Sequence, residues 1–165
     1  MAGLEGAIAR LRDTDARRSD IPAYVALGEA LHWVFAVDDT LAGRKQPDRK
    51  KYFEARNNSQ LGKVVAGMAY VRNLAVHQLA VVGGFHGAVY PSHDLYPRDD
   101  LYPSAGVLTW RPFDDLPVPD EPEKNERDDH YRRLLAGKPV LDGLEAARRY
   151  LARAPQHDLG GQPFK

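Results

Sequence analysis

The sequence predicts a mainly α-helical protein, a compact bundle of about four to five helices with one long insertion rich in proline and tyrosine. Apolar residues recur at helical spacing in about five separate segments of the chain. Glycine and proline stand where these segments should end or begin. A stretch of roughly forty residues in the second half carries no helical pattern, which makes it long for a simple connection.

Length and composition limit the classes of protein that fit. A chain of 165 residues suits a single domain that buries its own core. It contains no cysteine, which excludes disulfides and thiolate metal sites and favours a cytoplasmic setting. No segment has the roughly 20 apolar residues of a membrane span. Acidic and basic residues balance at 23 each, which argues against bulk electrostatic binding of nucleic acid.

The first two helices are expected over residues 4–18 and from about residue 20 to Leu41. In the first, apolar residues share one face. In the second, both faces are largely apolar, so we expect it to be buried on most sides. Ser19 and Asp20 are suited to cap its start, and Gly43 is suited to end it.

Residues 44–56 are highly charged, and we interpret them as a solvated connection. The alternative is a basic patch that follows a phosphate backbone. Tyr52 and Phe53 are expected to pack back onto the bundle.

The third helix is expected over residues 60–82, with an N-cap at Asn57, Asn58 or Ser59. Apolar side chains surround it, which predicts a central helix. They are Leu61, Val64, Val65, Met68, Val71, Leu74, Val76, Leu79 and Val82. Gly83 and Gly84 are expected to end it.

The insertion covers about residues 83–121 and includes the repeated letters DLYP at 94–97 and 100–103. Its prolines exclude a regular helix. Residues 107–110 are predicted as a short strand, paired with residues 88–90. We therefore expect a loop or a short hairpin lying against the bundle.

The last two helices are expected over residues 123–136 and 140–153, separated by a tight turn at Gly137 and Pro139. These segments complete a single domain over residues 1–154. Residues 155–165 are expected to be a disordered tail.

Four polar residues lie in the middle of the apolar third helix, at Tyr70, Arg72, Asn73 and His77. Each must find a partner or face a cleft, because burying an unpaired polar group costs free energy. On an ideal helix Tyr70, Asn73 and His77 fall within about 60° of one another, whereas Arg72 lies about 140° from His77. Arg72 can therefore bend towards that stripe or act across an interface.

The segment Arg72-Asn73-Leu74-Ala75-Val76-His77 resembles the motif of the HEPN superfamily, an arginine followed by a polar residue and then a histidine. The resemblance covers roughly residues 20–82. This sequence departs from the motif of one toxin branch of the superfamily, in which a tyrosine stands at the position of Leu79. In the superfamily an acidic residue from an earlier helix often supports the motif, and Glu29, Asp38 and Asp39 are placed for that role here.

The resemblance implies a metal-independent endoribonuclease, acting as a toxin or a defence component. Arg72 would stabilise the phosphate charge, His77 would shuttle protons, and Asn73 would orient His77 or contact phosphate. Tyr70 would support them. The resemblance also implies a homodimer, an RNA substrate and a nucleotidyltransferase-type antitoxin. We expect no cofactor, and no metal at His86, His93, Asp94 or Asp99, whose spacing matches no known site.

Two alternatives remain open from the sequence. The first is a catalytically silent HEPN-like module that binds RNA or a protein partner. The second is a structural helical protein in which Arg72 pairs with Asp38 or Asp39 inside the bundle. An arginine sealed against one of these acids would favour the second alternative.

Overall fold

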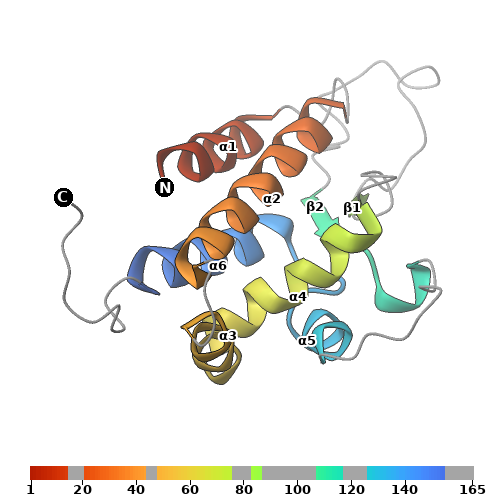
Figure 1. The fold of residues 1–165 in the computed structure, drawn as a ribbon. Helices are drawn as coiled ribbons and strands as arrows, with labels where there is room; N and C mark the ends of the chain where they lie inside the picture. The colour runs from red at the N-terminus through yellow and green to blue at the C-terminus, as the bar shows by residue number, and fades with distance from the viewer. Residues whose placement is uncertain (15–20, 44–47, 76–82, 87–106, 117–125, 155–165) are drawn as a thin grey trace, which may run out of the picture.

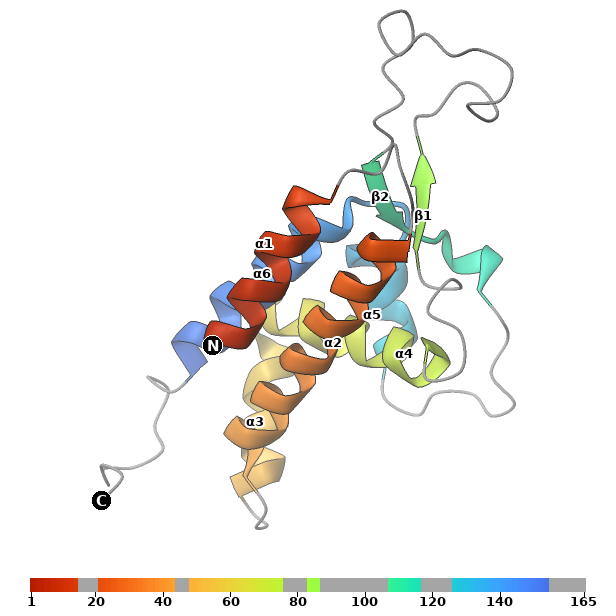
Figure 2. The ribbon, with the colours of Figure 1, turned by 90° about the horizontal axis from the view of Figure 1, so that it is seen from above.

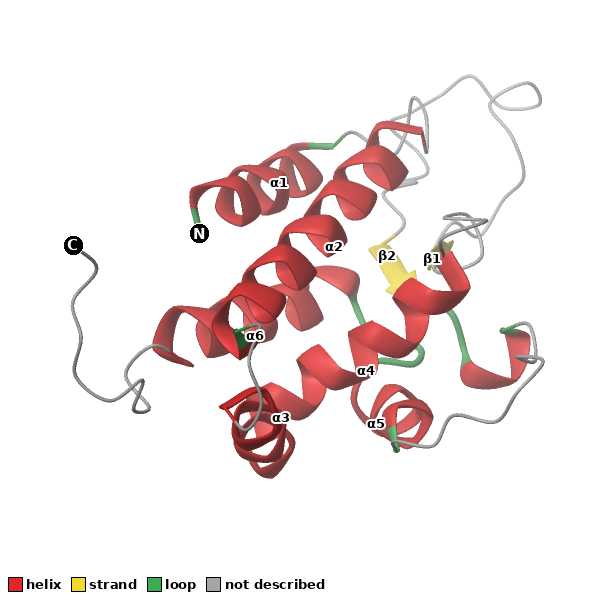
Figure 3. Cartoon of the chain, viewed as in Figure 1, coloured by secondary structure: helices red, strands yellow, loops and turns green. Residues whose placement is uncertain are grey.

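The computed structural model describes residues 1–14, 21–43, 48–75, 83–86, 107–116 and 126–154, with only the backbone of 73–75 and 83–86. The mainly helical class is confirmed, since six α-helices lie in these residues (Figure 3). They are α1 (Ala2–Asp13), α2 (Ile21–Ala42), α3 (Asp48–Asn58), α4 (Gln60–Ala75), α5 (Arg127–Leu134) and α6 (Val140–Arg153). The strands are β1 (Gly83–His86) and β2 (Val107–Trp110), and a 3-10 turn covers Phe113–Asp115. None of these helices combines the length and the apolar character needed to cross a lipid bilayer.

Helix α4 lies at the centre of the bundle, where it contacts α2, α3, α5 and α6 (Figures 1 and 2). Helix α1 packs against α2 and α6 at the side of the bundle away from α5. The buried apolar side chains of α4 point in several directions, which confirms the prediction of a central helix over 60–75. They are Val64, Val65, Ala66, Met68, Tyr70 and Val71. Residues 76–82 of the predicted helix lie outside the described residues.

The helix ends follow the glycine and capping signals of the sequence. Gly43 ends α2 with a φ of 68°, a backbone conformation that glycine adopts without strain. At the start of α4, Ser59 Oγ accepts a hydrogen bond from the Gly62 backbone N–H at 3.4 Å. The first helix is shorter than the predicted 4–18, because Thr14 already has an extended backbone. Residues 19 and 20, the expected cap of α2, lie outside the described residues.

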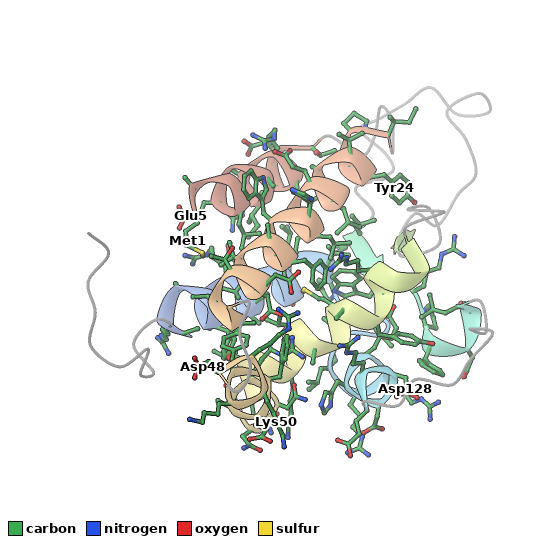
Figure 4. The ribbon with its side chains drawn as sticks, viewed as in Figure 1. Met1, Glu5, Tyr24, Asp48, Lys50 and Asp128 are labelled. Atoms are coloured by element: carbon green, nitrogen blue, oxygen red, sulfur yellow. The ribbon has the colours of Figure 1, made fainter. Side chains whose placement is uncertain are left out.

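Helix α3 is the element that the sequence did not predict, because the charges of residues 44–56 are typical of a solvated connection. Most of its side chains remain in contact with solvent, so the helix is held mainly by contacts with α2 and α4. Asp48 and Lys50, which Figure 4 labels at the start of α3, are both exposed, as expected for charged residues. Arg56 of the same helix is buried at 3% exposure.

Strand β2 holds the insertion against the helices. It pairs antiparallel with β1, with Gly83 opposite Trp110 and His86 opposite Val107. The predicted pairing with residues 88–90 is therefore wrong for β2, and Gly83 begins a strand. On the other side of β2, the Trp110 N–H donates to Lys138 O at 2.9 Å and the Gly137 N–H donates to Trp110 O at 2.9 Å. The turn between α5 and α6 thus fixes the position of the strand pair.

Helix α2 is less buried than predicted. Its inner face is buried at Leu27, Leu31 and Val34, as the apolar pattern predicts. On the outer face, however, Ile21 is 71% exposed and Val25 is 61% exposed. This end of α2 therefore presents apolar side chains to solvent.

Helices α4 and α5 approach each other closely at Gly67. A Cβ atom added at Gly67 would lie 2.9 Å from the Tyr131 backbone nitrogen and 3.1 Å from the Tyr131 Cα atom. Backbone atoms cannot rotate away as a flexible side chain can. The packing of α5 therefore requires glycine at this position.

We predict that Gly67→Ala lowers the free energy of unfolding by about 1–3 kcal/mol, because the added methyl group overpacks the interface between α4 and α5. Denaturant unfolding followed by circular dichroism measures this change. Gly6→Ala is the matched control, since its Cβ would meet only the Arg10 side chain, at 3.4 Å. Alanine should stabilise that helix by up to about 1 kcal/mol. Equal effects of the two variants would contradict the close approach.

Candidate functional site

Arg72 lies on the exposed surface of α4, near the C-terminal end of that helix. Its guanidinium carbon is 4.8 Å from the centroid of the Phe35 ring on α2. Phe35 itself is 6% exposed, so the guanidinium covers the edge of the core. A cation over an aromatic face is attracted to it, and this contact holds Arg72 without neutralising its charge.

The three acidic residues expected to support the motif all pair with other arginines. Glu29 pairs with Arg10 of α1. Asp39 pairs with Arg49 of α3, with 3.2 Å between Oδ1 and Nη2. Asp38 pairs with the buried Arg56, as described below.

The expected pairing of Arg72 with Asp38 or Asp39 is therefore not found. Among the residues that the structure describes, no carboxylate lies within ion-pair distance of Arg72. The physical reason is that arginines of α1 and α3 already neutralise these acids. A contact between these acids and His77 concerns residues outside the described part of the chain.

Tyr70 is a core residue. It is 3% exposed, and its ring stacks on Phe113 with 5.9 Å between centroids and 17° between planes. Its centroid is also 5.8 Å from that of Tyr131 on α5. Tyr70 therefore connects α4 with α5 and the 3-10 turn. The backbone of Asn73 belongs to α4, whereas its side chain and the whole of His77 lie outside the described residues.

The best-defined polar cluster joins α2 and α3. Arg56 Nη1 donates to Asp38 Oδ2 at 2.7 Å, and the two side chains are 4% and 5% exposed. The Tyr52 hydroxyl donates to Asp38 Oδ1 at 2.6 Å. Both carboxylate oxygens thus have a partner, which a buried carboxylate requires.

Two tyrosines of this cluster are held in their protonated form. Burial raises the pKa of Tyr52 far above its usual range, and the Asp38 carboxylate raises it further. Burial also raises the pKa of Tyr150 on α6, although hydrogen bonding with Tyr52 partly offsets this. An unperturbed tyrosine, with a pKa of about 10, already keeps its proton at neutral pH, and a raised pKa extends this to more alkaline solution. Tyr52 therefore serves as a fixed donor to Asp38.

Arg56 is the polar residue that the sequence analysis missed. Its guanidinium carbon lies 4.6 Å from the centroid of Phe53, and that of Arg49 lies 5.0 Å from the same ring. Arg49, Phe53 and Arg56 follow one another at helical spacing, so they share one face of α3. This spacing was the signal in the sequence that could have identified both the helix and its inner face.

The arginines Arg56 and Arg72 have different surroundings, which suit different roles. The Asp38 and Arg56 pair is buried and hydrogen-bonded, which suits the alignment of α2 with α3 and leaves little access for a substrate. Arg72 is exposed and available to an anion. In the described part of the chain, no group of three His, Asp or Glu residues is placed to hold a metal ion. The side chain of His86 and all of His93, Asp94 and Asp99 are not included in that part.

Comparison with known proteins gives no relative from which a role could be transferred. No family model, curated protein or solved structure matches the chain.

We predict that Arg56→Met lowers the free energy of unfolding by about 3–5 kcal/mol, because it leaves the buried Asp38 carboxylate without its cation. Arg49→Met is the matched control on the same helix. Its partner Asp39 is 57% exposed, so the loss of that ion pair should cost less than about 1 kcal/mol. Denaturant unfolding of both variants makes the comparison. Similar losses for the two would show that the Arg56 pair is not buried.

Proposed function

We propose that the protein is a HEPN-like, metal-independent endoribonuclease that uses Arg72 and His77, and that Asn73 assists them. The observation that carries the proposal is the exposure of Arg72 together with its lack of an acidic partner among the described residues. This arginine is exposed and rests on Phe35, and among the described residues no acid neutralises it. A structural arginine would instead be expected to be sealed in an ion pair within the bundle.

The reaction proposed for these residues needs no cofactor. The 2′-hydroxyl of the ribose attacks the adjacent phosphorus, the bond to the 5′-oxygen of the next nucleotide breaks, and a cyclic phosphate remains. A histidine suits the transfer of the proton between these oxygens, because its unperturbed pKa is about 6.5. A guanidinium binds two phosphate oxygens at once, which stabilises the charge that develops on the phosphoryl group.

The proposal includes a homodimer, in which the motifs of two copies line one cleft. The exposed apolar side chains Ile21 and Val25 on α2 support this, because apolar surface is enriched in homodimer interfaces. In a twofold dimer the same surface of each copy takes part. A cytoplasmic toxin or defence role, with a nucleotidyltransferase-type antitoxin, completes the proposal.

A silent HEPN-like module that binds RNA or a protein is the second candidate. It is favoured by the same exposed Arg72, since a cation open to solvent binds phosphate whether or not cleavage follows. The two candidates differ only in the chemistry of His77.

We predict that the wild-type protein cleaves single-stranded RNA in the presence of EDTA and leaves cyclic phosphate ends. His77→Ala should abolish cleavage, because no group remains to transfer the proton. Arg72→Lys keeps the charge but loses the planar fork, so cleavage should fall at least about tenfold while RNA binding weakens less. Gel analysis of labelled RNA, with filter binding in parallel, measures both quantities.

Arg133→Lys is the matched control for these variants, because Arg133 is an exposed arginine on α5 that pairs with Asp129. It should cleave as wild type does. RNA binding without cleavage by the wild type would favour the silent module. A folded wild type that neither binds nor cleaves RNA would contradict both candidates.

We predict that light scattering at micromolar concentration gives the mass of a dimer, and that Val25→Glu gives that of a monomer. A carboxylate on this face would have to be buried at the interface, which is unfavourable without a partner. Lys51→Glu is the control, since Lys51 is exposed on α3. A wild type that stays monomeric would rule out the composite cleft.

A further inference from the structure

A shallow hollow lies between the 3-10 turn and the C-terminal end of α5. Its volume is about 360 Å³, and it is lined by Pro112, Phe113, Asp114, Arg132, Ala136 and Gly137. This volume falls at the small end of the range of ligand sites, about 300–1,000 Å³. Ala136 has a small side chain and Gly137 has none, which leaves the space over the end of α5 open.

Aromatic stacking fixes one wall of the hollow. One contact of the Phe113 ring is the stack on the buried Tyr70. The Arg132 guanidinium lies over the Phe113 ring, with its carbon 4.1 Å from the centroid. The Tyr131 hydroxyl donates to Arg111 O at 2.6 Å, which ties the start of this turn to α5. The wall is therefore built on the core, although the hollow itself is open.

The hollow carries one positive and one negative group, both exposed. Arg132 and Asp114 each line it, and no ion pair or hydrogen bond joins either side chain to another residue in the ranges that the structure describes. Arg133, the neighbour of Arg132, differs from it because it pairs with Asp129 at 3.0 Å. Within the described part of the chain, the hollow therefore presents N–H donors and carboxylate acceptors to a ligand.

We propose that this hollow binds a guanine base of single-stranded RNA. Guanine has two adjacent acceptors, O6 and N7, which suit the fork of Arg132. It also has two adjacent donors, N1–H and the 2-amino group, which suit the Asp114 carboxylate. The other RNA bases lack this combination. Single-stranded RNA is commonly recognised in this way, by splayed bases that contact aromatic and guanidinium planes and are hydrogen-bonded at their edges.

The inference rests on the proposed function for its choice of RNA as the ligand. The position of the hollow agrees with that choice. Phe113 packs on Tyr70, which precedes Arg72 by two residues on α4, so the hollow lies near the end of the central helix that carries Arg72. A base held there would favour cleavage at a fixed distance from guanine.

Binding of 2′-O-methyl RNA hexamers tests this site separately from catalysis, because such RNA lacks the attacking hydroxyl. One labelled hexamer alternates uridine with guanosine, and a second alternates uridine with adenosine. By fluorescence anisotropy the wild type should bind the guanosine hexamer about tenfold more tightly, in line with the discrimination of one bidentate contact. Arg132→Gln and Asp114→Asn should each remove most of this preference.

Two neighbouring residues provide matched controls, and inosine provides a chemical one. Asp115→Asn and Arg133→Gln change residues next to the hollow that do not line it, so both should keep the preference. Inosine lacks the 2-amino group, so replacing guanosine with inosine should weaken binding to wild type but not to Asp114→Asn. Thermal unfolding identifies any variant that fails to fold. If Arg132→Gln fails to fold, Arg132→Lys replaces it in the binding measurement.

The outcomes separate this inference from the proposed nuclease. A wild type without preference for guanosine, or a preference that both hollow variants retain, would overturn the guanine site even if RNA is cleaved. A preference that depends on Arg132 and Asp114 would support the site even if no RNA is cleaved. In that case the failure would belong to the proposed reaction of Arg72 and His77.

Discussion

The buried ion pair between Asp38 and Arg56 is the interaction on which the rest of the arrangement depends. A carboxylate at 5% exposure in the second half of α2 is costly unless a cation and further donors reach it. Arg56 and Tyr52 meet that requirement, and both come from α3. Satisfying Asp38 therefore fixes α3 against α2. The tight turn at Ser59 then directs α4 through the centre of the bundle, with Arg72 near its far end.

This arrangement explains why an arginine on the central helix remains at the surface. The acids of α2 are neutralised by residues of α1 and α3, and Arg72 is left with an aromatic partner instead of an ionic one. A stack on Phe35 fixes the direction of the side chain but retains its charge. The fold thus uses one set of arginines for stability and leaves another exposed for anions. Arg132 beside the hollow is a further exposed arginine that lies over an aromatic ring, at the same end of α4 as Arg72.

The elements that periodicity alone defines were predictable, and those that tertiary contacts define were not. The apolar stripe of α6 and the glycines after α2 and α5 marked these boundaries closely, since each signal is local. Helix α3 was missed because its many charges are typical of a solvated connection, although Arg49, Phe53 and Arg56 recur at helical spacing. The predicted partner of β2, residues 88–90, was wrong. The position of β2 depends on its hydrogen bonds to the turn between α5 and α6, which the sequence does not reveal. At the candidate site, Asp38 was expected to pair with Arg72, but its partner is Arg56 of α3.

The central claim is that Arg56 stabilises the fold through Asp38, whereas Arg72 takes no part in that ion pair. A double-mutant cycle on the free energy of unfolding tests this claim most directly. It compares the coupling of Asp38 with Arg56 to the coupling of Asp38 with Arg72, using Asp38→Ala, Arg56→Met and Arg72→Met. The account predicts a coupling of at least about 2 kcal/mol for the first pair. For the second pair it predicts a value within the additivity of independent sites, about 0.5 kcal/mol. A coupling of Asp38 to Arg72 as large as that to Arg56 would contradict the account, because it would make Arg72 part of the structural network.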